Sequence, residues 1–149
     1  MNAQDLLPPQ DVPAYQEAIC RLQTAGVRLT ETRKAILAYL VASCSHPSAD
    51  MIFQDLQPHY DTISLATVYN NLKLLINEGL ISEIRRKNDT TTYYDFMGHK
   101  HVHLICETCD HIIDLDIKTP DLKKEIIDSS GFMPHRENYI VYGICPECQ

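Results

Sequence analysis

Apolar residues in the first half of the chain recur with the period of amphipathic helices. Between positions 15 and 80 they lie three or four residues apart, and almost no stretch alternates as a strand does. Three segments begin at a hydroxyl residue that can accept a hydrogen bond from the first turn of a helix. The pattern therefore predicts three helices, from Thr30 to Ser43, from Ser48 to a stop at Pro58, and from Ser64 to Glu78.

The helix expected from Ser64 to Glu78 separates an apolar stripe from a polar face. The stripe consists of Val68, Leu72, Leu75 and Ile76. The residues largely outside it are Thr67, Tyr69, Asn70, Asn71 and Lys73. Asparagine can read adenine, threonine can touch a thymine methyl group, and tyrosine and lysine can contact phosphates, so this face suits a DNA major groove. A solvated polar surface would give the same pattern.

Strand patterns begin after Gly79. Two β-rich segments, 80–86 and 91–96, flank a polar turn at 87–89, and helices followed by such a hairpin indicate a winged helix-turn-helix. Further strands are expected at 102–106, 112–116 and 139–144, with a helix that starts at Thr119 or Pro120 and ends near Gly131. The fold class is therefore α+β, with a winged helix followed by a small α/β domain.

The segment Met97 to Lys100, which contains Gly98, is the expected hinge. Five of the seven histidines and four of the six cysteines lie at or beyond His99. We therefore expect a winged-helix domain with an N-terminal extension over residues 1–96, a hinge over 97–100, and a metal-binding domain over 101–149.

The charge of the chain argues against extensive contact with nucleic acid. The formal net charge is −7, and residues 1–97 hold 8 basic and 11 acidic side chains. Because phosphate neutralisation needs clustered lysine and arginine, any DNA-binding face must be a local patch. Besides the helix face, the candidate contacts are Ser64, Arg28, Arg33, Arg85 and Arg86.

Composition places the chain among ordinary globular proteins. The hydrophobic fraction is 44% and the charged fraction 22%, which excludes fibrous and disordered classes. No apolar run approaches the ~20 residues that span a bilayer. The first 13 residues lack the basic start and apolar stretch of a signal peptide, so we expect a cytoplasmic protein.

Two Cys-x-x-Cys motifs carry the strongest chemical signal. Cys106 with Cys109, and Cys145 with Cys148, can place four thiolates around one tetrahedral Zn²⁺. Disulfides and redox-active pairs are the alternatives, and the cytosol disfavours the former. A closed four-sulfur site leaves no position for a substrate, so its expected role is structural. The remaining cysteines, Cys20 and Cys44, have no partner at a useful spacing, and we expect both in the core.

Three histidines at alternate positions form a second candidate metal site. In a strand, His99, His101 and His103 would point to one face, with Asp95 before them and Asp114 after. Nitrogen and oxygen ligands without thiolates suit Fe²⁺, Mn²⁺ or Zn²⁺, whereas an exposed polar strand face is the alternative. A sensing site separate from the zinc site is therefore expected.

No enzyme motif emerges from the sequence. It contains neither a glycine-rich phosphate loop nor a Gly-x-Ser-x-Gly elbow, so we do not expect an enzyme. A metal-dependent hydrolase stays open as an alternative, because histidine and aspartate are its usual ligands. A zinc-stapled metal storage module is a further alternative, and it predicts no selective affinity for DNA.

Five stretches together resemble the ferric uptake regulator family and, within it, the peroxide-sensing repressors. They are Arg28–Arg33 (RLTETR), His46–Asp50 (HPSAD), Ser64–Leu72 (SLATVYNNL), His101–Cys109 and Tyr142–Cys148. The resemblance implies a homodimer that binds double-stranded operator DNA, with a C-terminal dimerisation domain that holds the four-cysteine zinc. It also implies a regulatory Fe²⁺ or Mn²⁺ held by ligands from both domains, namely His46, Asp95, His101, His103 and Asp114.

The peroxide-sensing repressors react with H₂O₂ when they hold Fe²⁺, so that a ligand histidine is oxidised and DNA is released. By resemblance, His46 and His101 are the expected targets here, and Mn²⁺ would give a repressor that resists peroxide. Asp114, where many iron sensors have glutamate, favours peroxide sensing over an iron- or manganese-responsive uptake repressor of the same family. His99 and Glu137 depart from the family pattern, and we expect a solvated side chain at His99.

Overall fold

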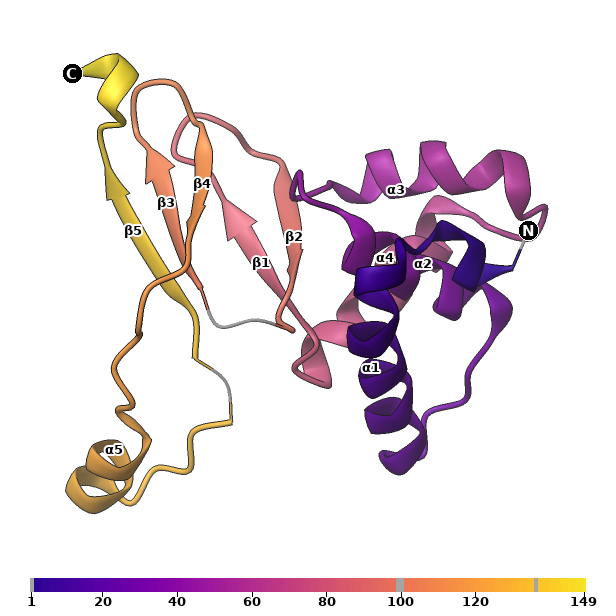
Figure 1. Cartoon of the computed structure of the whole chain (residues 1–149), viewed down its shortest axis with the longest axis horizontal. Helices are drawn as coiled ribbons and strands as arrows, with labels where there is room; N and C mark the ends of the chain where they lie inside the picture. Colours follow the sequence, from indigo (N-terminus) through magenta and orange to yellow (C-terminus); the bar gives the residue numbers. More distant parts are fainter. Residues whose placement is uncertain (1, 99–100, 136) are drawn as a thin grey trace. The chain divides into compact units, whose positions relative to one another are not determined.

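A computed structural model describes residues 2–98, 101–135 and 137–149, which form two compact units (Figure 1). The first unit comprises Met1–Ile84 and Thr91–Gly98, and the second comprises Arg85–Thr90 and His99–Gln149. His99, for which we expected a solvated side chain, lies outside the described residues, as does part of the expected hinge. None of the described helices is both long enough and apolar enough to cross a bilayer.

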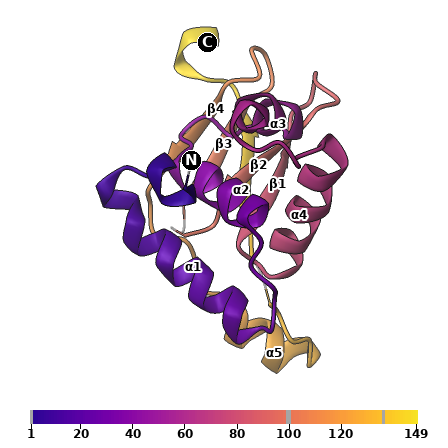
Figure 2. The same cartoon turned by 90° about the vertical axis from the view of Figure 1, so that its right-hand side faces the viewer.

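The three predicted helices of the first unit are confirmed and each begins at its expected cap, whereas no bounds were predicted for the helix that precedes them. The unit contains α1 (Val12–Thr24), α2 (Glu31–Ala42), α3 (Ala49–Leu56) and α4 (Leu65–Asn77), preceded by 3₁₀ turns at Ala3–Leu6 and Pro9–Asp11 (Figure 2). The hydroxyls of Thr30, Ser48 and Ser64 each accept a backbone N–H three residues on, which satisfies an otherwise unpaired donor of the first turn. Another 3₁₀ turn, Gln57–His59, follows α3 and contains Pro58.

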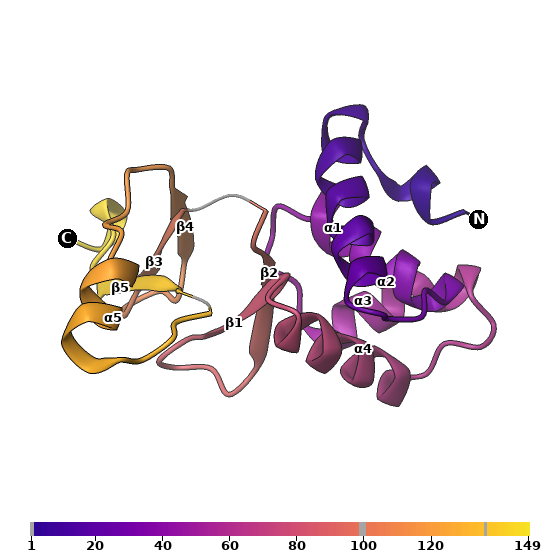
Figure 3. The same ribbon diagram turned by 90° about the horizontal axis from the view of Figure 1, so that it is seen from below.

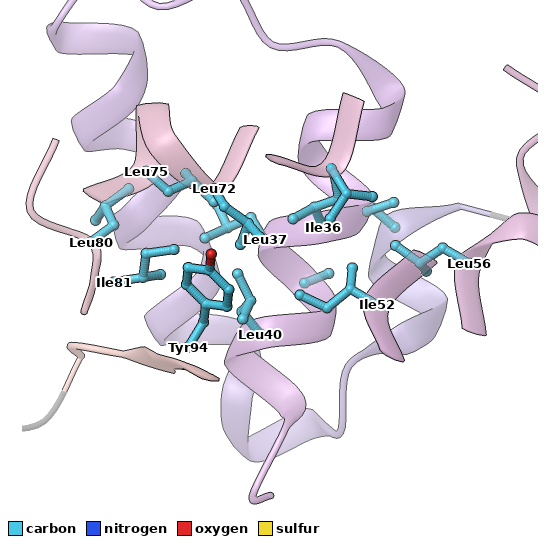
Figure 4. Close-up of a cluster of buried hydrophobic side chains, with 14 of the residues drawn as sticks. Ile36, Leu37, Leu40, Ile52, Leu56, Leu72, Leu75, Leu80, Ile81 and Tyr94 are labelled. Atoms are coloured by element: carbon cyan, nitrogen blue, oxygen red, sulfur yellow. The ribbon is translucent and has the colours of Figure 1, made fainter. Parts of the chain in front are cut away.

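Helix α2 forms the centre of the first core. Ala35, Ile36, Leu37 and Ala38 are fully buried, and Leu72 of α4 is 1% exposed. Figure 4 shows the leucine and isoleucine side chains of α2, α3 and α4 gathered with the ring of Tyr94, which is 5% exposed. Burial of this apolar surface, at roughly 25 cal/mol per Å², is the main force that holds the four helices together.

A two-stranded hairpin completes the first core, as the sequence predicted. It consists of β1 (Ile81–Arg85) and β2 (Thr92–Phe96), which follow α4 (Figure 3). The backbone N–H of Tyr94 donates to the carbonyl of Pro47 at 2.9 Å, and Ser48 forms an isolated bridge with Tyr93. The loop between α2 and α3 is thereby fixed against β2, which brings His46 beside that strand.

The second unit is a three-stranded sheet with one helix. Strand β3 (Val102–Cys106) lies between β4 (Ile112–Leu115), to which it is antiparallel, and β5 (Tyr139–Gly143), to which it is parallel. Helix α5 (Lys123–Ser130) lies in the connection from β4 to β5, and a 3₁₀ turn, Pro146–Cys148, ends the chain (Figure 1). The three strands match the sequence-based prediction to within one residue.

The predicted start of the last helix was wrong by three to four residues. Helix α5 begins at Lys123, not at Thr119 or Pro120. The carbonyl of Pro120 accepts a 2.7 Å hydrogen bond from the Tyr139 hydroxyl, and Asp121 accepts one of 3.2 Å from the backbone N–H of Lys123. The predicted first turn of the helix included Pro120 and Asp121. These hydrogen bonds hold that segment in a non-helical conformation instead.

The prediction that the two unpaired cysteines lie in the core was also wrong. Cys20 and Cys44 are both exposed. The buried face of α1 carries Tyr15, Ala18 and Leu22, and Cys20 stands between the last two on a different side of the helix. Cys44 lies in the loop after α2, where no apolar periodicity applies.

Candidate metal centres and DNA-binding face

The four paired cysteines converge in the second unit. Cys106 ends β3, Cys109 lies in the turn after it, Cys145 follows β5, and Cys148 ends the final 3₁₀ turn. Their four sulfur atoms all lie within 4.8 Å of one another, and those of Cys109 and Cys145 are 3.8 Å apart. Sulfurs bound at ~2.3 Å to one tetrahedral zinc ion stand about 3.8 Å apart, so the cluster fits this ion.

Local hydrogen bonds lower the thiol pKa of one of these cysteines and raise that of another. The pKa of Cys106 falls to about 6, mainly because the backbone N–H of Cys145 donates to its sulfur at 3.4 Å. The pKa of Cys148 rises to about 12, mainly because its thiol is hydrogen-bonded to the sulfurs of Cys145 and Cys109. Four sulfurs this close cannot all be thiolates without a cation among them, which a divalent metal supplies.

The first unit holds two of the predicted regulatory ligands side by side. Nε2 of His46 lies 3.5 Å from Oδ1 of Asp95, and the side chains are 7% and 11% exposed. His46 follows α2 and has a left-handed backbone, with φ of 52°, and Asp95 belongs to β2. The bond from Tyr94 to Pro47 holds the two segments together, so the pair is a product of the local fold.

The second unit holds the other three predicted regulatory ligands. His101 precedes β3, His103 lies within it, and their imidazole rings meet edge to face with centroids 4.5 Å apart. Asp114 pairs with His103 in the antiparallel register, and its Oδ1 lies 2.8 Å from Nδ1 of His103. Its Oδ2 lies 3.9 Å from Nε2 of His101. One carboxylate thus faces two imidazoles, an arrangement that can ligate a metal or orient ligands to it.

Helix α4 presents a narrower polar face than its sequence predicted. Tyr69 is 48% exposed, and Asn70 and Lys73 are exposed as well. Asn71, however, is 4% exposed, which contradicts the expectation that it lies outside the apolar stripe. It stands three positions after Val68 and four before Leu75, so it falls on the buried face of the helix.

The other candidate DNA contacts differ in how much of each side chain is available. Arg28 and Arg85 are exposed, and Arg86 is half-buried. The hydroxyls of Ser64 and Thr67 lie 2.8 Å apart at the start of α4. Arg33 is half-buried, and its Nε donates to Oδ1 of Asn71 at 2.8 Å. Sequence analysis missed this last pair, because nothing in the spacing of residues 33 and 71 links them.

Comparison with known proteins identifies one family over most of the chain. Residues 24–142 match the model of the ferric uptake regulator family. The peroxide-responsive repressor PerR of Staphylococcus aureus is 38% identical over 135 residues, which is 90% of each chain.

Two solved structures have the same fold. PerR from Streptococcus pyogenes, studied for peroxide sensing and gene regulation, is 51% identical with a TM-score of 0.57, over 91% of this chain and 93% of that one. The ferric uptake regulator of Francisella tularensis, solved with iron, is 28% identical with a TM-score of 0.57, over 83% of this chain and 95% of that one.

Replacing Cys109 with serine should weaken zinc binding by about a hundredfold or more, since the ~10–16 kcal/mol of a structural zinc site is shared among four ligands. Zinc per chain, measured after competition with a chelator, checks this. Cys20→Ser is the matched control, because Cys20 is exposed and lies outside the cluster. Equal zinc retention by both variants would contradict a four-thiolate site.

Proposed function

This chain belongs to the ferric uptake regulator family, and we propose from this premise that it is a metal-dependent transcriptional repressor that senses hydrogen peroxide. The observation that carries the proposal is the separation of two donor sets. Four sulfurs gather at one place in the second unit, whereas His46 lies beside Asp95, and His103 beside Asp114, with no cysteine in either pair. Soft thiolates suit a structural Zn²⁺, and nitrogen with oxygen suits Fe²⁺ or Mn²⁺.

We propose that one regulatory Fe²⁺ or Mn²⁺ ion is held by His46 and Asp95 from the first unit together with His101, His103 and Asp114 from the second. The pairing of ligands inside each unit supports this, since the members of each half-set lie within 4 Å of a partner in the same unit. A ligand that binds one arrangement of the two units more tightly raises the population of that arrangement, and hence its affinity for DNA.

Peroxide sensing follows from which side chains surround the ion. Bound Fe²⁺ would promote transfer of one oxygen atom from H₂O₂ to an imidazole ring, with the other oxygen released as water, and Mn²⁺ would not do so comparably. By resemblance to the peroxide-sensing repressors, His46 and His101 are the proposed sites of oxidation. An oxygenated imidazole ring would be a poorer metal ligand, so the DNA-binding arrangement would lose its metal support while the four thiolates keep their zinc.

We propose that α4 enters the major groove of an operator and that the repressor works as a homodimer in the cytoplasm. Tyr69, Asn70 and Lys73 are exposed on α4, and Arg28 and Arg85 are exposed as well. Strand β5 is an edge strand whose Val141 and Tyr142 are 52% and 50% exposed, which suits a second copy. Two copies would place two such faces on one duplex, so a modest patch suffices despite the net charge of −7.

The competing functions are less well supported. The solved ferric uptake regulator is 28% identical, whereas the peroxide-sensing PerR is 51% identical over a longer part of the chain, which favours peroxide sensing over metal uptake control. Members of this family are transcription regulators, and no observation favours a hydrolase. The storage alternative predicts no sequence-selective DNA binding, which the following experiment measures.

DNA binding by the zinc-loaded protein, with Fe²⁺ or Mn²⁺ added without oxygen, tests the proposal. The probe is the duplex that the Mn²⁺-loaded protein enriches most from a randomised pool. Both metals should raise affinity for this duplex by ~5–150-fold, the usual range of such coupling. A small dose of H₂O₂ should abolish the gain with Fe²⁺ only. Binding that follows metal level and survives peroxide would indicate an uptake regulator instead.

Replacing His46 with alanine should remove the gain in DNA affinity that Mn²⁺ gives, while zinc per chain stays unchanged. His46 contributes to the proposed regulatory set and lies outside the four-thiolate cluster. His59→Ala is the matched control, since His59 is an exposed histidine of the same unit. Loss of zinc from the His46→Ala protein would show that the two metal sites are not independent.

A further inference from the structure

Arg33 ties the start of α2 to the middle of α4. Its Nε donates a 2.8 Å hydrogen bond to Oδ1 of Asn71, and its Nη1 donates to the backbone carbonyl of Arg28. Its own backbone N–H donates to the Thr30 hydroxyl that caps α2. The planar guanidinium is therefore held at two points, by the segment before α2 and by α4, and its direction is fixed.

Both polar atoms of the Asn71 side chain form hydrogen bonds within the first unit. While Oδ1 accepts from Arg33, Nδ2 donates a 2.9 Å hydrogen bond to the carbonyl of Thr67, one turn earlier in α4. Thr67 in turn donates its backbone N–H to the Ser64 cap at 3.1 Å. Asn71 is 4% exposed, so these bonds replace the water that its amide would otherwise contact.

An asparagine at position 71 fixes the rotation of α4 more closely than an apolar side chain would. Val68, Leu72 and Leu75 are buried neighbours on the same face of α4, and a leucine at position 71 would complete an apolar stripe. Apolar contacts tolerate a small rotation of a helix, whereas hydrogen bonds of 2.8–2.9 Å require their atoms in place. Asn70 and Asn71 are neighbours on one helix, about 100° apart around its axis. Any rotation of α4 about that axis would therefore turn the exposed Asn70 by the angle of the rotation.

We infer that Arg33 and Asn71 are positioning residues for operator recognition: they hold α4 at the rotation at which Tyr69, Asn70 and Lys73 reach DNA, and neither contacts DNA itself. The inference rests on the proposed function. It replaces the sequence-based expectations that Asn71 reads a base and that Arg33 holds the DNA backbone.

The test compares variants of the full chain loaded with zinc and Mn²⁺. The probes are the duplex most enriched by the wild-type protein and a scrambled duplex of the same composition, each titrated over a range of salt concentrations. The variants are Asn71→Leu, Arg33→Lys and Arg33→Met, with Asn70→Leu as the matched control on the exposed face of α4. Denaturant unfolding of each variant, followed by circular dichroism, reports whether it is folded.

The three variants of the pair should each bind the selected duplex about tenfold more weakly, because each breaks a hydrogen bond to a charged group. Their affinity for the scrambled duplex and their salt dependence should stay at the wild-type values. Arg33→Lys should lose as much affinity for the selected duplex as Arg33→Met, since lysine keeps the charge but lacks the planar guanidinium with its several N–H donors. Combining Arg33→Lys with Asn71→Leu should cost no more than either change alone, whereas combining it with Asn70→Leu should give the product of the two effects.

A direct DNA contact by Arg33 would give another pattern. Arg33→Met would weaken both duplexes and reduce the salt slope by about one, and Arg33→Lys would bind nearly as the wild type does. That result, or wild-type affinity in Asn71→Leu, would overturn the inference. If Asn71→Leu unfolds, the two Arg33 variants still give the answer. Failure of the wild-type protein to enrich any sequence would instead overturn the proposed function, and the inference with it.

Discussion

The second unit depends on its four sulfur atoms because it has too little apolar core to hold its strands. Among its described residues, the buried hydrophobic side chains are Val102, Ile105, Cys106 and Cys145. Two of the four are themselves proposed zinc ligands. The four-sulfur cluster joins the end of β3 to the segment after β5, next to the parallel pairing of Cys106 with Gly143. A structural zinc site contributes ~10–16 kcal/mol, an amount comparable with the whole stability of a small domain.

This division of labour explains how the chain can react at one metal and keep its fold at another. The thiolates hold a closed, redox-inert ion, whereas the imidazoles and carboxylates surround the proposed regulatory ion. In the proposed mechanism, oxidation of a histidine would weaken one ligand of the regulatory set without releasing β3 from β5. The local fold supports the same separation, since β2 fixes His46 and Asp95 while β3 and β4 fix His103 and Asp114.

Sequence predicted those features that local chemistry decides. The hydroxyl caps at Thr30, Ser48 and Ser64 marked three helices, and the spacing of the cysteines marked the sulfur cluster. It failed where contacts distant in sequence decide the outcome. Asn71 lies on the buried face of α4 and its amide oxygen is satisfied by Arg33 of another helix, and α5 starts late because the carbonyl of Pro120 accepts a hydrogen bond from Tyr139. Cys20 was misplaced because hydrophobic character alone does not say which side of a helix a residue occupies.

In the proposed mechanism, peroxide acts on the nitrogen and oxygen ligands and spares the thiolates. The most direct measurement is peptide mass analysis, together with zinc content, of the protein loaded with zinc and Fe²⁺ after one stoichiometric dose of H₂O₂. We expect an added oxygen on the peptides that contain His46 or His101, with zinc retained in full. Oxidised cysteines at positions 106, 109, 145 and 148, with zinc released and both histidines unchanged, would contradict it.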